Sequence, residues 1–206
     1  VKPEVTREEF TQSVADGTLE ENLRYVPVKE GEALNIPAGL IHAITAGAVI
    51  YEVQQNSDTT FRVYDYNRRG DDGKLRELHV EDIDSVFAGL KISDDETLLV
   101  HNRYFDVRSL KIQDTLERST KGRSFHVLTN LEGTLSLHFD GGETMLTAGE
   151  TCLIPASLGT YRLSSEDGAS AILSQLPDPE ALDEAKALAK EQGLALETCV
   201  GLEPEA

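Results

Sequence analysis

The chain has 206 residues, 39% of them hydrophobic, which is enough for one large or two small globular domains. Its 37 acidic and 19 basic residues give a formal charge of -18, which opposes nonspecific binding to nucleic acid or to anionic lipid. The sequence has no run of about 18 apolar residues that would span a membrane, and its first residues lack the apolar core of a signal peptide. We therefore expect a soluble, cytoplasmic protein whose partners are neither nucleic acid nor membrane.

The first 24 residues are expected to be helical. Thr6 is a suitable N-cap, and Phe10, Val14 and Leu19 recur near helical spacing, with an interruption at Gly17. This pattern predicts a helical hairpin or two short helices.

Most of the remaining chain is expected to be strands. Between Val26 and Tyr66 lie the β-branched and aromatic runs VPV, ALNIP, AVIYEVQ and TTFRVYDY. Asp72-Gly73 is a strong turn dipeptide, and VEDIDSVFAGL predicts one short helix. A second β block follows from about residue 97 to 175, with a hairpin at Asp140-Gly141-Gly142. The alanine-rich run PDPEALDEAKALAKEQG then predicts a helix.

One histidine follows a turn motif. Residues 31 to 42 read GEALNIPAGLIH, so that Gly31, Pro37, Gly39 and His42 form the pattern G-x5-P-x-G-x2-H, which resembles the second signature of the cupin family. Glycine and proline favour a tight turn, and a neutral imidazole at a strand end is a common ligand for a transition metal. His42 is therefore either a metal ligand or an ordinary hydrogen-bonded histidine of a barrel.

The motif occurs a second time. Residues 149 to 160, GETCLIPASLGT, repeat it at a constant offset of 118 residues and share Gly-Glu, Ile-Pro-Ala and the following Leu. Two copies predict two small barrels. Because Thr160 replaces His42 and is a poor ligand for a borderline metal, we expect the second barrel to be structural.

A polar block begins ten residues after His42. In a strand, alternate side chains share a face, so Glu52 projects with its neighbours at 54 and 56, and Arg62 with Tyr64 and Tyr66. This polar face either lines a cavity or is solvated, in which case Asp58 and Arg62 form only a surface ion pair.

Three linked motifs, IPAGLIHAI, YEVQQNSDTTFRVYDYNR and GKLRELHVEDI, resemble the short bacterial form of type I mannose-6-phosphate isomerases, over about residues 1 to 176. The resemblance implies an all-β fold of two cupin-like jelly-roll β-barrels with short helical additions. We expect a helical segment at 1–24, the remainder of the first, metal-binding barrel at 25–92, a second, metal-free barrel at 93–176, and a C-terminal helix and tail at 177–206.

The resemblance also implies zinc-dependent interconversion of mannose 6-phosphate and fructose 6-phosphate. It makes His42 a zinc ligand and Arg62 an essential residue, with Glu52 and Asp58 lining the site. Glu52 is a reasonable proton carrier between C1 and C2 of the sugar. Arg62 either stabilises the enediolate or binds the substrate phosphate, and Asp58 would orient its guanidinium.

The first cupin signature, with the other zinc ligands, is expected before residue 1, because residues 1–30 contain no histidine. We expect the chain to represent the C-terminal two thirds of the enzyme and to be inactive unless the missing N-terminal segment is present as another chain. Its expected partners are the sugar phosphate and either this N-terminal segment or further copies of the chain in a homo-oligomer. The remaining histidines are expected not to bind metal: His79, His101, His126 and His138.

Two alternatives compete with the zinc isomerase. One is a metal-free sugar-binding or regulatory cupin, in which Glu52 and Arg62 only hold a ligand. The other is an iron-dependent and oxygen-dependent cupin enzyme, which needs two histidines and a carboxylate.

Overall fold

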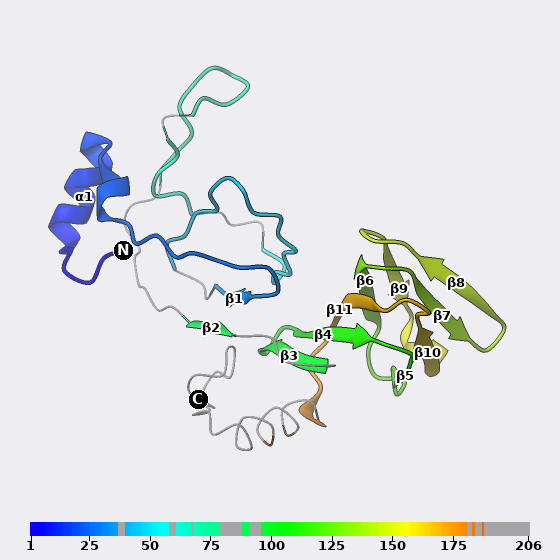
Figure 1. The fold of residues 1–206 in the computed structure, drawn as a ribbon. Coiled ribbons are helices and arrows are strands. Elements are labelled where there is room, and N and C mark those ends of the chain that lie inside the picture. Colours follow the sequence, from blue (N-terminus) through cyan, green and yellow to red (C-terminus); the bar gives the residue numbers. More distant parts are fainter. Residues whose placement is uncertain are drawn as a thin grey trace. The chain divides into compact units, whose positions relative to one another are not determined.

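A computed structural model describes residues 1–36, 40–57, 61–66, 68–78, 88–90 and 96–180, together with Asp183 and Ala187. The chain divides into two compact units. The first contains Val1–Glu30 and Ile36–Phe87, and the second contains Gly31–Asn35 and Ala88–Ala206. In Figure 1 the labelled helix belongs to the blue, N-terminal part of the chain, and most strands belong to the green to orange part.

Two short helices open the first unit, as the sequence predicts. They are α1 (Arg7–Asp16) and the 3-10 helix η1 (Leu19–Asn22). Thr6 caps α1, because its hydroxyl accepts a hydrogen bond from the Glu9 amide while the Glu9 carboxylate accepts one from the Thr6 amide. Gly17, at a φ of 73°, ends the helix, and Phe10 and Leu19 are its buried contacts. Local capping therefore fixes this segment.

The strands predicted in the rest of the first unit are mostly absent from the described residues. Residues 40–57 and 61–66 contain no regular strand, and the side chains of Val49, Ile50 and Phe61 are exposed. A strand is stable only when neighbouring strands pair with its backbone and one of its faces is buried. The alternation of apolar and polar residues predicts strands here, but the described residues of this part of the chain form none, because no neighbouring strands pair with them.

A single strand comes from the ALNIP run. It is β1 (Ala33–Asn35), which pairs antiparallel with β2 (Ala88–Leu90) in the second unit. The helix predicted for VEDIDSVFAGL is therefore wrong at residues 88–90, and its earlier residues lie outside the described chain.

The repeated motif has a repeated backbone. Gly31 and Gly149, which begin the two copies, have φ angles of 80° and 87°. A strand starts two residues after each glycine, at Ala33 in β1 and at Thr151 in β9. Because a left-handed φ favours glycine, the conserved spacing reflects the same turn into a strand in both copies.

Besides the β1–β2 pair, the second unit contains two larger antiparallel sheets. The five-stranded sheet has the order β3-β4-β11-β6-β9, and the four-stranded sheet has the order β5-β10-β7-β8. Their bounds are β3 (Glu96–His101), β4 (Asp106–Ile112), β5 (Thr115–Ser119), β6 (His126–Glu132), β7 (Leu135–Phe139), β8 (Gly142–Leu146), β9 (Thr151–Ile154), β10 (Thr160–Ser164) and β11 (Ala169–Gln175). A 3-10 turn, η2 (Ala156–Leu158), separates β9 from β10. The Asp140 hairpin prediction is confirmed by the β7–β8 pair.

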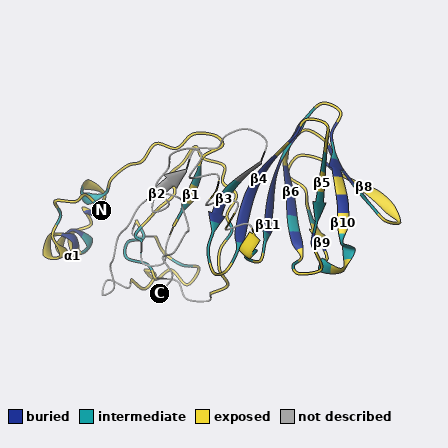
Figure 2. Cartoon of the chain, turned by 90° about the horizontal axis from the view of Figure 1, so that it is seen from below, coloured by how far each residue is buried: buried dark blue, intermediate teal, exposed yellow. Residues whose placement is uncertain are grey.

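The core of the second unit lies between its two sheets. Leu110, Leu128 and Leu173 enter it from the larger sheet, and Leu137 and Leu163 enter it from the smaller one. Buried and exposed residues alternate along β10, which Figure 2 shows as a change of colour along the arrow. The all-β prediction is confirmed here, and alternation in the sequence is what aligns the apolar side chains on one face.

Two turns at one end of the sheets are in close contact. Gly133, between β6 and β7, has a φ of 72°, and a Cβ atom at this position would overlap the carbonyl oxygen of Gly168. The Asn130 side chain, which is fully buried, donates hydrogen bonds to the carbonyls of Gly133 (2.9 Å) and Leu146 (3.0 Å). Glycine is therefore required at 133 for both conformational and steric reasons.

Side-chain contacts fix the chain just after β11. The Leu176 amide donates to the Ser124 hydroxyl (3.0 Å), and the Asp178 amide donates to a carboxylate oxygen of the buried Asp106 (2.9 Å). The helix predicted from Pro177 falls largely outside the described residues. In the described part of the chain, none of the helices has the length and apolar character needed to span a membrane.

Candidate functional site

Arg62 lies beside a carboxylate that the sequence analysis did not select. Its Nε atom is 3.9 Å from a carboxylate oxygen of Asp65, and the Arg76 guanidinium binds both oxygens of the same carboxylate. The Asp65 side chain has only 12% of its surface exposed, whereas that of Arg62 has 26%. Asp65 is thus a shared partner that restricts the positions of two arginines.

A third cation adds to this group. The pKa of Asp65 lies below its ordinary value, chiefly because of the hydrogen bonds from Arg76, and the charges of Arg62 and Arg68 act in the same direction. The Arg68 guanidinium lies 5.3 Å from the ring centre of Tyr66, which in turn is 5.0 Å from that of Tyr64. We call Arg62, Asp65, Arg68 and Arg76 the arginine cluster. Three cations around one carboxylate form a locally positive site in an acidic chain.

A tight hairpin brings Arg76 back to Asp65. Gly73 has a φ of 74°, as the predicted Asp72-Gly73 turn requires, and the Gly70 amide donates to the Lys74 carbonyl (2.9 Å). The Arg69 side chain also donates to the Gly73 carbonyl (2.7 Å). The turn itself was predictable, but its consequence, the pairing of the second motif with the third, was not.

The other predicted site residues are exposed or lie outside the described part of the chain. His42 is exposed, and its Nδ1 atom lies 2.9 Å from the Leu40 carbonyl oxygen. This differs from the expected inward position, because the described residues around it form no barrel wall. Glu52 is also exposed, and Asp58 lies outside the described residues. The catalytic and ligand roles of these residues stay predictions.

The described residues do not fit a complete zinc site. A structural or catalytic zinc ion needs about three or four protein ligands, and the described part of the chain contains no cluster of three or more His, Cys, Asp or Glu residues suited to a metal. Zinc at His42 therefore stays a prediction that requires further ligands.

Three of the other histidines lie in the second unit, and each has a protein partner. His101 pairs with the buried Asp106, and His138 contacts Glu143 (3.1 Å) on the surface of the smaller sheet. His126 lies between the sheets, 2.8 Å from the Tyr161 hydroxyl. His79 lies outside the described residues.

Burial, followed by the positive charges of Arg118 and Arg108, lowers the pKa of His126 to about 4. The imidazole is therefore neutral at physiological pH.

Comparison with known proteins identifies the fold. Residues 95–174 match the family model described as "Mannose-6-phosphate isomerase, cupin domain". The structure also resembles the crystal structure of the mannose 6-phosphate isomerase from Bacillus subtilis, with a TM-score of 0.67 and 27% sequence identity over 82% of this chain and 57% of that chain. The predicted cupin jelly-roll fold is thereby confirmed.

Curated relatives give the same result. The chain is 32% identical to mannose-6-phosphate isomerase ManA of Bacillus subtilis over 183 residues, which are 83% of this chain and 57% of ManA. It is 28% identical to the mannose-6-phosphate isomerase of Streptococcus mutans over 172 residues, 78% of this chain and 54% of that protein. The chain belongs to the mannose-6-phosphate isomerase family. The resemblance inferred from the three motifs is confirmed. The chain spans a little over half the length of the curated relatives it matches.

Proposed function

We propose that this chain forms part of an aldose-ketose isomerase that interconverts mannose 6-phosphate and fructose 6-phosphate. The relatives named mannose-6-phosphate isomerase support this proposal. The observation that carries it is the arginine cluster, in which the second and third motifs of the resemblance meet at Asp65. A positive site of this kind suits a substrate that carries a phosphate and develops negative charge during the reaction.

In this proposal, Arg62 contacts the substrate, either at the phosphate or at the oxygen atoms of the enediolate. Asp65 and Arg76 are positioning residues, because the bidentate pair fixes the carboxylate beside which Arg62 lies. Glu52 is the proposed proton carrier: it would take the proton from C2 of the aldose and return it to C1 through the enediol. Asp58 is proposed to line the same site.

Turnover of the 206-residue chain joined to the N-terminal segment of a related isomerase tests this function, because the chain alone is expected to lack the other zinc ligands. Mannose 6-phosphate is supplied, fructose 6-phosphate is measured by a coupled assay, and zinc is added or chelated in parallel. Arg62→Ala should reduce turnover about 10²-fold, the scale of removing one electrostatic stabiliser. Arg103→Ala is the matched control, because Arg103 is an arginine of the second unit that stacks on Tyr104. Equal and measurable turnover by the two variants would exclude Arg62 from the site.

Metal content tests His42 separately. If His42 is a zinc ligand of a completed site, His42→Ala should lower the zinc bound per chain along with turnover, whereas His138→Ala should leave the zinc content unchanged. Unchanged zinc in His42→Ala would contradict the ligand assignment.

A metal-free sugar-binding protein is the second candidate, in which the arginine cluster binds the phosphate of the sugar without catalysis. The two functions predict different results for a chain that shows no turnover. Fructose 6-phosphate that binds with the same affinity before and after chelation, and more weakly to Arg62→Ala, would support the binding protein over the isomerase.

A further inference from the structure

An apolar pocket lies on the second unit, whereas the arginine cluster belongs to the first unit. Its volume is about 420 Å³, within the range of small-molecule sites. The pocket is formed where the chain enters β6, leaves β9 and leaves β11. Its lining residues are Arg123, Ser124, Phe125, Leu153, Pro155, Ala156 and Leu176.

The pocket is unusual because large apolar side chains line it and remain accessible to solvent. Phe125 is 43% exposed, Leu153 is 66% exposed and Leu176 is 47% exposed. Single exposed apolar residues are common on protein surfaces, but three that line one concave site favour an apolar ligand.

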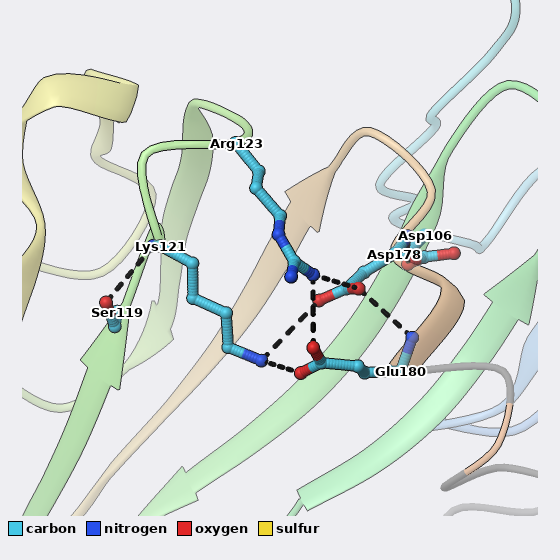
Figure 3. Close-up of polar contacts among 6 residues, drawn as sticks. All are labelled: Asp106, Ser119, Lys121, Arg123, Asp178 and Glu180. Carbon is cyan, nitrogen blue, oxygen red and sulfur yellow. Dashed lines mark hydrogen bonds and ion pairs between the residues drawn. The ribbon is translucent and has the colours of Figure 1, made fainter.

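Arg123 is the cation in the pocket lining, and its guanidinium already forms ion pairs with two carboxylates. Arg123 Nη1 lies 3.4 Å from a carboxylate oxygen of Asp178 and 3.2 Å from one of Glu180. Lys121 forms an ion pair with Glu180 and lies 3.9 Å from Asp178. Figure 3 shows these four side chains meeting, with Lys121 and Arg123 reaching from the β5–β6 loop. The chain's own carboxylates thus mark where a carboxylate binds beside the pocket.

The two acidic residues differ in what they contact and in their exposure. The Asp178 amide donates to the buried Asp106, and the Glu180 amide donates to an Asp178 carboxylate oxygen (3.1 Å). The Glu180 side chain is 52% exposed, and the Arg123 side chain is 57% exposed. An incoming carboxylate can therefore replace Glu180 on Arg123 while Asp178 stays in place, because exposed ion pairs contribute little stability.

We propose that this pocket binds a small molecule with an apolar body and one carboxylate group. The apolar body packs against Phe125, Leu153 and Leu176, and the carboxylate accepts hydrogen bonds from Arg123 in place of Glu180. The existing ion pairs select this ligand class: Arg123 already binds carboxylates, and a ligand carboxylate that takes the place of Glu180 on Arg123 has the same charge and hydrogen-bonding geometry.

The test uses the whole chain and benzoate as the probe, followed by amide NMR titration. Benzoate should shift the resonances of residues 123–125, 153 and 176, whereas benzyl alcohol, which has the same ring without the charge, should bind at least about tenfold more weakly. Arg123→Gln should weaken benzoate binding about tenfold, and Arg103→Gln, an arginine elsewhere in the same unit, should not. Glu180→Gln should strengthen it about threefold, since it removes the internal competitor.

A second pair of variants tests the apolar part. Leu153→Asp places a negative charge in the pocket and should abolish benzoate binding, whereas Met145→Asp changes a side chain of similar exposure, 64%, on the other sheet and should not. The proposal is overturned if benzoate shifts none of the pocket residues or if Arg123→Gln and Arg103→Gln bind it equally. It is also overturned if these resonances move with protein concentration alone, because a second copy would then cover the pocket.

Discussion

The two units of this chain are stabilised in different ways. The second unit buries a continuous set of aliphatic side chains between two sheets, and its strands are paired along their length. In the first unit, the described residues beyond the two short helices form turns and ion pairs around Asp65 while Val49, Ile50 and Phe61 stay exposed. The motifs that most strongly suggest function therefore lie in the part with the smaller core. Resemblance in a motif and stability of the surrounding fold are separate properties.

The largest effect should come from the core of the second unit. Leu163 on β10 is fully buried between Leu116 and Leu137 on the neighbouring strands. Leu163→Ala should lower the free energy of unfolding by about 2–5 kcal/mol, because it removes buried methyl groups and leaves a cavity. Val49→Ala, at a side chain with 103% exposure, should change it by less than about 0.5 kcal/mol. Urea unfolding measures both, and similar losses would show that the first unit also has a core at Val49.

The next largest effect should be a change of folding stability with pH that arises from His126 in the second unit. His126 is 4% exposed with a pKa of about 4, below the ordinary 6.5. Between pH 6.5 and 4 the unfolded chain binds a proton that the folded chain does not, so this contribution to stability falls as the pH falls. The loss approaches about 3 kcal/mol at pH 4.

Urea unfolding at several pH values measures this slope. His126→Gln should flatten it, whereas His138→Gln, at the surface beside Glu143, should leave it unchanged. A slope that persists in His126→Gln would assign it to other groups.

A smaller effect is expected in the first unit, at the start of α1. Thr6→Ala removes the hydroxyl that accepts from the Glu9 amide and should destabilise the helix by about 1 kcal/mol. Thr11→Ala is the control, because the Thr11 hydroxyl donates a hydrogen bond to the Arg7 carbonyl within the helix and does not cap a helix end. Amide hydrogen exchange across α1 measures both variants, and equal protection would show that tertiary packing, not capping, holds α1.

The smallest effect should come from the ion pairs at Glu180. Hydrogen bonds and charge from Lys121, followed by those from Arg123, hold the pKa of Glu180 below its ordinary value. This pairing stabilises the folded chain above the ordinary glutamate pKa and is lost as the pH falls through the lowered value. Glu180→Gln should therefore slightly lower the thermal midpoint at pH 7 in low salt, and added salt should remove the difference. A salt-independent difference would indicate packing instead.

Sequence reasoning succeeded where neighbouring residues determine structure. Thr6, Glu9 and Gly17 are sufficient to define α1, and the Asp140 hairpin needs only its own turn and two alternating flanks. It failed for AVIYEVQ, because a strand also needs partners that no local pattern supplies. The division at residues 24, 92 and 176 stays a prediction.

The site was predicted only in part. Arg62 was selected, and Asp65 lies beside it, which sequence reasoning missed. The predicted partner of Arg62, Asp58, four residues before it, lies outside the described residues, so that pairing stays a prediction. The turn at Asp72-Gly73 brings Arg76 to the Asp65 carboxylate, and sequence spacing does not give that distance. Sequence alone also does not show which residue of the repeat points into the core. Thr160, which matches His42, is exposed, while the next residue, Tyr161, is buried. An alignment error of one residue along a strand reverses which side chain points inward.

The contact between Gly133 and the Gly168 carbonyl has a practical consequence for protein engineering. Exposed turns usually tolerate affinity tags, fluorophores and peptide insertions. Here, lengthening either turn would force the other to move and would disturb the Asn130 side chain beneath them. The β7–β8 turn at Asp140 and Gly141 offers a safer attachment point, because a Cβ atom at Gly141 would meet no other atom within 4 Å. Its φ of 97° favours keeping the glycine and attaching the label at Asp140.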